Sequence, residues 1–199
     1  EVAEQEKQTN YPIHIKFNTG LNRLGFWEND VDYIVEKLES TNAVIAKSLF
    51  SHLAASEDKK EKKFSLQQIK TFKRISEDFQ TKMGYKPWLH LCNTSGVINY
   101  AEAHLDMVRC GIGLYGFGNS AKEDINLKPI ATLKSIISQI HSIEKDETVG
   151  YNRAYIASGS EKTATIPIGH ADGISRQFGS GKGYVFINNQ KAPIIGNVC

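Results

Sequence analysis

The chain has 199 residues, of which 40% are hydrophobic and 23% charged, a composition typical of a folded globular protein and unlike that of a disordered one. Its formal net charge is only +2 at pH 7, and lysines alternate with acids through residues 56–63, so no one-sign surface for a nucleic acid is expected. The three cysteines lack metal-ligand spacing, and no apolar run approaches the roughly 20 residues that span a bilayer. We therefore expect a protein of the reducing cytoplasm that binds no metal, nucleic acid or membrane.

Residues 1–124 alternate short apolar runs with longer stretches of helical period, a pattern typical of an α/β domain with parallel strands. Strands are expected at 12–17, 43–50, 88–92 and 107–109, and helices at 30–39, 64–83 and, briefly, 100–104. In 64–79, apolar residues recur at steps of three and four, which predicts a helix with one buried stripe.

After Gly118 the pattern changes to strand-like runs at 129–141, 162–168, 183–187 and 192–198, separated by Gly and Asn. We therefore expect a second, all-β domain at 125–199. Because the junction 119–126 is short for a linker, a single α+β domain is the alternative.

Five segments resemble, in order, segments of bacterial alanine racemases. They are HIKFNTGLNRLGF at 14–26, HLCNTSG at 90–96, DMVRCGIGLYG at 106–116, VGYNRAY at 149–155 and IPIGHADG at 166–173. One match alone would be weak, whereas five in order over nearly the whole chain are not expected by chance. The resemblance implies the C-terminal half of a (β/α)8 barrel followed by part of a C-terminal β-domain, with pyridoxal 5'-phosphate at the barrel mouth.

In barrels, a phosphate commonly binds where backbone N–H groups and small hydroxyls converge at the carboxyl ends of the last strands. Loops of this kind are expected at 93–96 and 111–112. The resemblance implies that Thr94, with Asn93 beside it, and the amides of Gly111 and Ile112 bind the cofactor. Thr94 stands where the family usually has serine and keeps the hydroxyl; an ordinary Asn-Thr turn is the alternative.

Arg109 matches the family arginine that faces the pyridine nitrogen of the cofactor. Because an arginine keeps its proton at any working pH, it would leave that nitrogen unprotonated and weaken the ring as an electron sink. His90 and His52 match histidines that hydrogen-bond around this arginine and around the catalytic tyrosine. Both are expected to support the site, and a purely structural histidine is the alternative.

Tyr151 matches the tyrosine base that exchanges the α-proton on one face of the substrate, while a Schiff-base lysine serves the other face. A phenol with an ordinary pKa of about 10 is a poor base at neutral pH, so cations must favour its phenolate; Arg109 acting through His52 is one source. Tyr155 is the competitor, and two plain strand aromatics are the alternative. In the family this tyrosine reaches the other subunit, which implies a homodimer with composite active sites.

Lys16 is not expected to be the Schiff-base lysine. It resembles the position of a carbamylated lysine that orients the following arginine, here Arg23, toward the substrate carboxylate. Asn18 stands where the family often has aspartate, so a carbamate and an unmodified strand-end lysine are equally open.

Two features depart from the family pattern. His170 replaces the tyrosine usual in the substrate access channel, which leaves the shape and polarity of that channel open. The Schiff-base lysine and the first half of the barrel are absent, because such a barrel takes about 250 residues and the Lys16 motif resembles one from its middle. We therefore expect an internal fragment, inactive alone, of a stand-alone racemase or of one fused to a cell-wall enzyme such as a Mur ligase.

The resemblance implies an isomerase that interconverts L- and D-alanine for peptidoglycan synthesis. The alternatives are a serine or broad-range amino-acid racemase, an amino-acid decarboxylase of related fold, and a non-enzymatic barrel that binds pyridoxal phosphate. Decarboxylases of this fold place a carboxylate at the pyridine nitrogen, so Arg109 argues against them. The non-enzymatic barrel lacks a β-domain and any counterpart of Tyr151.

Overall fold

The structure is a computed structural model that describes residues 1–124 and 127–199. The chain divides into two compact units, Glu1–Ala131 and Thr132–Cys199, and each is described by itself. The domain boundary expected between residues 124 and 125 remains a prediction, because residues 125 and 126 lie outside the described residues. In the described part of the chain, no helix is both long and apolar enough to cross a membrane.

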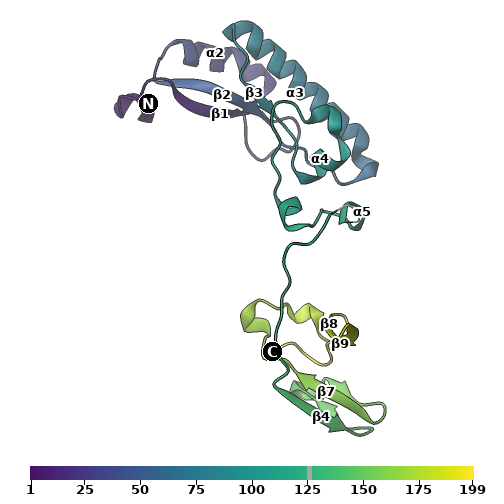
Figure 1. The fold of residues 1–199 in the computed structure, drawn as a ribbon. Coiled ribbons are helices and arrows are strands. Elements are labelled where there is room, and N and C mark those ends of the chain that lie inside the picture. The colour runs from purple at the N-terminus through teal and green to yellow at the C-terminus, as the bar shows by residue number, and fades with distance from the viewer. Residues whose placement is uncertain (125–126) are drawn as a thin grey trace. The chain divides into compact units, whose positions relative to one another are not determined.

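A three-stranded parallel sheet organises the first unit (Figure 1). It contains β1 (Tyr11–Lys16), β2 (Val44–Phe50) and β3 (Trp88–His90) in that order, connected through α2 (Val31–Glu39) and α3 (Lys62–Met83). Shorter helices are α1 (Val2–Gln5), α4 (Thr94–Asn99) and α5 (Ala121–Asp124). The order β1, α2, β2, α3, β3 confirms the alternation of strand and helix predicted for this part of the chain.

The core of the first unit lies between the sheet and the two long helices, which cover the same side of it (Figure 1). The apolar stripe predicted on α3 is buried there: Ile69, Phe72, Ile75 and Phe79 pack with Ile15 of β1. Because successive strand residues point to opposite faces, the even-numbered residues of β1 face away from this core. The helix-free face of the sheet is therefore available for polar side chains.

A β-bulge shifts the register between β1 and β2. Ile13 pairs with Ala46, whereas the next residue, His14, pairs with Ser48, so Lys47 has no partner in β1. The inserted residue sets His14 opposite Ser48.

Three short elements of this unit differ from expectation. The strand expected at 107–109 is a single bridge between His90 and Met107, and the helix expected at 100–104 is a 3-10 turn, Ala101–Ala103. The loop expected at 93–96 is instead the start of α4, capped by Asn93, whose Oδ1 accepts from the amide of Gly96 at 2.9 Å. An asparagine cap and an asparagine turn use the same bond from side chain to backbone, so composition alone does not separate them.

The second unit contains three antiparallel pairs of strands and, in its residues, no α-helix. The pairs are β4 (Gln139–Ile143) with β7 (Glu161–Thr165), β5 (Thr148–Val149) with β6 (Tyr155–Ile156), and β8 (Tyr184–Ile187) with β9 (Gln190–Pro193). The all-β character predicted for this part of the chain is confirmed.

Three of the strands predicted in this unit were too long, and one of them, expected at 162–168, ends at Thr165. The strand expected at 129–141 begins only at Gln139, and the strand expected at 192–198 ends at Pro193. A strand needs a hydrogen-bonded neighbour, and in the described residues no strand pairs with 129–137. The apolar side chains of this stretch are instead exposed, at 70% for Ile130, 73% for Leu133 and 71% for Ile136.

Candidate active site

Arg109 lies at the centre of a set of polar contacts at the carboxyl ends of β2 and β3. Its Nη1 donates to Nδ1 of His90 at 2.5 Å, and its Nη2 donates to the carbonyl oxygens of Ser51 at 2.8 Å and Leu91 at 3.2 Å. The same Nη2 lies 3.1 Å from Nδ1 of His52. The structure therefore brings together three of the residues singled out in the sequence, Arg109, His90 and His52.

Burial and positive neighbours keep both histidines neutral. Burial is the largest of three causes that lower the pKa of His90 to about 4, and the charges of Arg109 and His14 follow. Burial also lowers the pKa of His52, and the charges of Arg109, Arg23 and Lys16 lower it further. Because a guanidinium can only donate, a neutral ring with an unprotonated Nδ1 is the form that fits beside it in each case.

The loop after β1 folds back onto the end of the strand. The amide of Phe26 donates to the carbonyl of Lys16 at 2.9 Å, and the amide of Asn18 donates to the carbonyl of Phe26 at 2.7 Å. The buried side chain of Asn18 accepts from the amides of Gly20 at 3.1 Å and Asn22 at 3.0 Å. Asn18, at the position where the family often has aspartate, thus shapes the loop that carries the predicted substrate-binding arginine.

Arg23 is exposed on this loop, and its charge acts on Lys16. Burial is the first cause that lowers the pKa of Lys16, and the charges of Arg23 and Arg109 lower it further. Gly25 makes the return of the loop possible, because its φ is +115° and a Cβ there would lie 2.9 Å from the carbonyl oxygen of Lys16. Lys16, Arg23 and Arg109 therefore form one electrostatically coupled group.

Thr94 forms a second polar feature with the turn that follows Arg109. Its Oγ1 accepts from the amide of Gly111 at 3.1 Å and from the amide of Gly113 at 3.2 Å. Ile112, between them, begins the 3-10 turn Ile112–Tyr115. Gly113 was not singled out in the sequence, although a Cβ there would lie only 2.6 Å from Cγ2 of Thr94. The repeated glycine of GIG is the one signal that pointed to it.

A buried carboxylate lies beside this turn and had no signal in the sequence. Glu123 is 3% exposed, and its Oε2 accepts from the hydroxyl of Ser95 at 3.0 Å and from the amide of Asn119 at 2.7 Å. Its Oε1 accepts from Nδ2 of Asn99 at 2.7 Å. These bonds tie the segment after residue 118 to α4, which begins at Thr94.

Tyr151 and His170, the remaining predicted site residues, lie in the second unit. Tyr151 begins a 3-10 turn, Tyr151–Arg153, and its side chain is 77% exposed. The hydroxyl of its competitor, Tyr155, donates to the carboxylate of Glu161. His170 is exposed at the start of another 3-10 turn, and its amide donates to the carbonyl of Cys199 at 2.6 Å.

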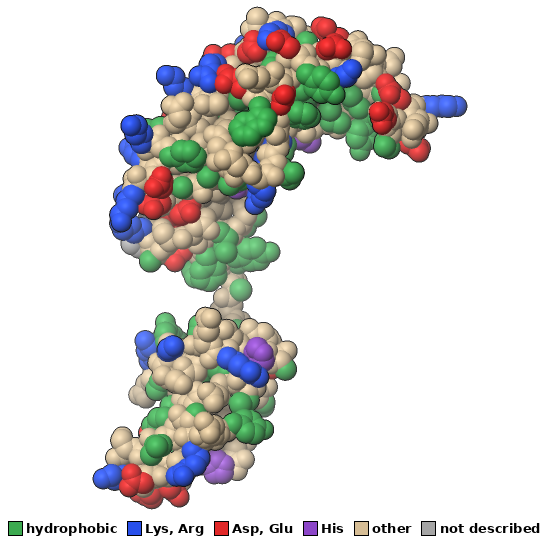
Figure 2. Space-filling model, turned by 180° about the vertical axis from the view of Figure 1, so that it is seen from behind, with side chains coloured by type: hydrophobic (Ala, Val, Ile, Leu, Met, Phe, Trp, Pro, Cys, Tyr) green, Lys and Arg blue, Asp and Glu red, His purple; other side chains and the backbone are tan. Residues whose placement is uncertain are grey.

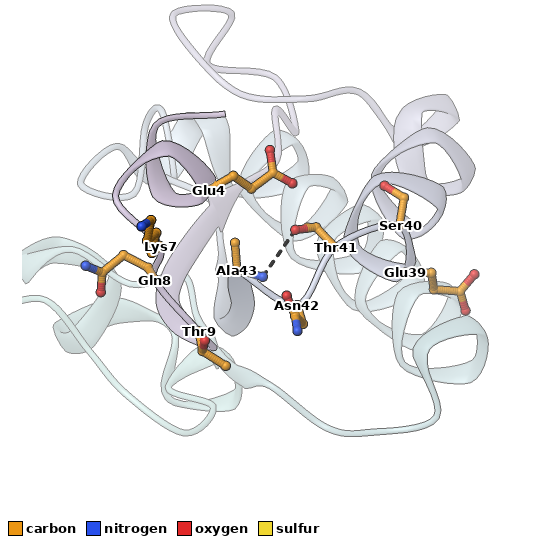
Figure 3. Close-up of a pocket in the computed structure, with 9 residues that line it drawn as sticks. All are labelled: Glu4, Lys7, Gln8, Thr9, Glu39, Ser40, Thr41, Asn42 and Ala43. Atoms are coloured by element: carbon orange, nitrogen blue, oxygen red, sulfur yellow. Dashed lines mark hydrogen bonds between the residues drawn. The ribbon is translucent and has the colours of Figure 1, made fainter.

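A separate groove of about 630 Å³ lies where β1 and β2 begin (Figure 3). It is lined by Glu4, Lys7, Gln8, Thr9, Glu39, Ser40, Thr41, Asn42 and Ala43. The candidate residues of the first unit lie at or after the opposite, carboxyl ends of the strands, where α/β proteins commonly bind ligands. The groove is therefore distinct from the candidate site.

The surface carries charges of both signs. Figure 2 shows basic and acidic side chains interspersed over the face in view, in keeping with the low net charge.

Comparison with known proteins gives two family matches along the chain. The model described as "Alanine racemase, N-terminal domain" matches residues 1–118, and "Alanine racemase, C-terminal domain" matches residues 130–199. A curated alanine racemase of Fusobacterium nucleatum subsp. nucleatum is 38% identical over 196 residues, which cover 97% of this chain and 53% of that protein. The chain spans about half the length of the curated relatives it matches.

Solved structures agree with these matches. An alanine racemase of Clostridium difficile 630 superimposes with a TM-score of 0.85 at 27% identity, covering 100% of this chain and 52% of that one. An alanine racemase from Bartonella henselae, solved with covalently bound pyridoxal phosphate, gives a TM-score of 0.78 at 25% identity and covers 100% and 53%.

Proposed function

The chain belongs to the alanine racemase family, and from this premise we propose that it is part of an enzyme that uses pyridoxal 5'-phosphate to interconvert L- and D-alanine. The observation that carries the proposal is the group of cations at the strand ends. Burial is the first cause that lowers the pKa of His52, and the charges of Arg109, Arg23 and Lys16 lower it further, so these three charges act on one ring. Within the described residues, Arg109 donates to carbonyl oxygens and imidazoles and to no carboxylate. An uncompensated group of this kind suits anionic ligands such as a phosphate and a substrate carboxylate.

Pyridoxal phosphate fits these residues. The hydroxyl of Thr94 and the amides of Gly111 and Ile112 would hold its phosphate, with the Gly111 amide exchanging its present hydrogen bond to Thr94 for one to the phosphate. Asn93 would fix the start of α4 beside them. Arg109, supported by His90, would face the pyridine nitrogen. When bound, the cofactor supplies an electron sink that acidifies the α-proton of the amino acid. A guanidinium that keeps its proton limits that sink, which favours simple return of the proton over side reactions.

The remaining residues would handle the substrate. Arg23 would bind the alanine carboxylate, and Tyr151 would remove or return the α-proton on one face. The lowered pKa of Lys16 increases the share of neutral amine, the form from which a carbamate is made. A carbamate at Lys16 would hold Arg23 by charge. His170 would line the access channel.

We also propose the wider architecture that the family implies. Residues 1–124 would be the C-terminal half of a (β/α)8 barrel, and residues 125–199 the first part of the β-domain. Parallel strands with both long helices on one side support the barrel, because barrel helices lie outside and the active site forms at the carboxyl ends of the strands. The exposed phenol of Tyr151 supports a homodimer in which it serves the other subunit's site. The enzyme would act in the cytoplasm and supply D-alanine for peptidoglycan.

The test is an assay of the complete protein that contains this chain, purified with pyridoxal phosphate. We expect L-alanine to lose its circular dichroism as D-alanine accumulates, with serine converted more slowly. Release of carbon dioxide without racemisation would instead identify a decarboxylase. Cofactor binding without turnover of any amino acid would identify a non-enzymatic barrel. The 199-residue chain alone is the matched control and is expected to be inactive.

A further inference from the structure

A row of hydrogen bonds extends from Arg109 across the helix-free face of the sheet. Beyond the Arg109–His90 contact, Nε2 of His90 lies 3.0 Å from Oγ of Ser48, and the same Oγ lies 2.5 Å from Nδ1 of His14. His90 lies in β3, Ser48 in β2 and His14 in β1, so the row crosses all three strands. Ser48 and His90 are buried, and His14 is exposed. We call Arg109, His90, Ser48 and His14 the Arg109–His14 row.

Hydrogen-bond chemistry fixes the protons between Arg109 and Ser48, and the partners of Ser48 assign the remaining one. Arg109 can only donate, so Nδ1 of His90 must present its lone pair. A neutral ring then carries its proton on Nε2, which donates to Oγ of Ser48. The single hydroxyl proton of Ser48 is left to donate to Nδ1 of His14, the other partner that the structure gives this oxygen. The reverse direction would leave His90 with no proton on either nitrogen, which does not occur at working pH.

The arrangement also depends on the register of the strands. The bulge at Lys47 sets His14 opposite Ser48, and Phe50, two residues further along β2, pairs with His90. The ring of Phe50 stacks on that of His90, with centroids 4.9 Å apart and planes 5° from parallel. His90 is therefore held by packing on its face and by one hydrogen bond at each ring nitrogen.

We propose that Ser48 and His14 are positioning residues, which fix the tautomer and ring orientation of His90 and, through it, the plane of the Arg109 guanidinium. Without the Ser48 hydroxyl, the Nε2 proton of a buried ring has no acceptor in this row, and leaving a buried donor unpaired is unfavourable. His90 would then gain by turning or by moving its proton, and either change removes the acceptor from Nη1 of Arg109. The tautomers follow from geometry alone, whereas the effect on activity rests on the proposed function.

Four variants of the complete, cofactor-loaded protein separate these effects. Ser48→Ala removes the middle of the row, and His14→Leu removes its far acceptor. His14→Asn keeps an acceptor, because the amide oxygen takes the place of Nδ1. Ser76→Ala is the matched control, since Ser76 is also buried but donates only to the carbonyl of Phe72 in its own helix at 2.8 Å. Nitrogen NMR of labelled histidines reports which ring nitrogen carries the proton.

In the unmodified protein, we expect protons on Nε2 and none on Nδ1 for both His14 and His90. Ser48→Ala should shift the ring signals of both histidines, whereas Ser76→Ala should leave them in place. We expect kcat/KM for racemisation to fall about tenfold in Ser48→Ala and His14→Leu, the effect of one lost hydrogen bond, and to stay within about twofold of the unmodified enzyme in His14→Asn.

A proton on Nδ1 of either histidine in the unmodified protein would overturn the direction of the row. Equal activity of Ser48→Ala and Ser76→Ala would overturn the positioning role. A protein with the expected tautomers but no racemase activity would contradict the proposed function and leave the Arg109–His14 row intact. The two failures are therefore distinguishable.

Discussion

The hydroxyl of Tyr155 donates to the carboxylate of Glu161, lying 2.9 and 2.8 Å from its two oxygens. This hydrogen bond is the first cause that raises the pKa of Tyr155, and burial and the negative charge of Glu161 raise it further. At neutral pH, a smaller share of Tyr155 is therefore in the phenolate form than for an ordinary phenol. Of the two tyrosines that the sequence left open, we therefore keep Tyr151 as the proposed base.

Tyr151→Phe in the complete enzyme should lower kcat for racemisation by about 100-fold or more, because a general acid–base group contributes on the order of 10²–10⁴. Pyridoxal phosphate should remain bound, as judged from the absorbance of the purified variant. Tyr155→Phe is the control and should keep most of the activity. Retention of more than about a tenth of the activity in Tyr151→Phe would show that Tyr151 is not the base.

Thr94→Val should weaken cofactor binding, since it removes the hydroxyl while keeping the branched shape. A hydrogen bond to a charged group contributes about 1.5–3 kcal/mol, so the Kd for pyridoxal phosphate should rise about 10- to 150-fold. Thr94→Ser keeps the hydroxyl and should bind nearly as well as the unmodified protein. Fluorescence titration of the cofactor-free protein measures both, and similar affinities for the two variants would remove Thr94 from the phosphate site.

Gly113→Ala should destabilise the protein by about 1–3 kcal/mol, the usual effect of overpacking, because the new methyl would meet Cγ2 of Thr94 at 2.6 Å. Thr94→Ser removes that methyl group, and the nearest side-chain atom that remains at position 94 is Oγ1, at 3.3 Å. The effect of Gly113→Ala should therefore be smaller in the double variant. Urea unfolding of the unmodified protein, the two single variants and the double variant gives the coupling free energy between positions 94 and 113. If the two single effects on the free energy of unfolding simply add in the double variant, this contact is not the cause.

Stability should fall as the pH is lowered from about 6.5 toward 4. The folded-state pKa of His90 is lowered to about 4, mainly by burial, from its ordinary value of 6.5. Between these values the unfolded chain binds a proton that the folded one does not, so acidification favours unfolding by up to about 1.4 kcal/mol per pH unit. The lowered pKa of His52 acts in the same direction.

The comparison for this pH effect is His90→Asn, which keeps an acceptor for Arg109 and cannot titrate. Unfolding midpoints in urea at pH 7 and pH 5 should differ less for His90→Asn than for the unmodified protein. An equal pH dependence in the two proteins would mean that His90 does not remain neutral in the folded state.

The sequence was informative where local pattern and tertiary structure agree. The apolar spacing of α3 predicted its buried stripe, and the motifs around Arg109 pointed to the histidines that contact it. Ser48 and Glu123 had no such signal, because a serine in a strand and a glutamate in a short helix look the same whether exposed or buried. The strand expected from residue 129 failed for another reason: its apolar pattern is present, but no strand among the described residues pairs with its first part.

The bulge at Lys47 has a consequence for how the length of this strand can vary. Ala46 and Leu49 are both buried in the helix-side core, yet residues three apart point to opposite faces of a regular strand. Because the bulge adds one residue between them, Ala46 and Leu49 point to the same face. Lys47 itself is exposed, with Nζ 4.6 Å from the ring centroid of Trp88. Loss of the Lys47 codon would restore regular alternation and leave Ala46, Ser48 and Leu49 on their present faces. We therefore expect an in-frame deletion scan of β2 to find Lys47 the most dispensable position, and a Lys47 deletion as damaging as a Leu49 deletion would contradict this.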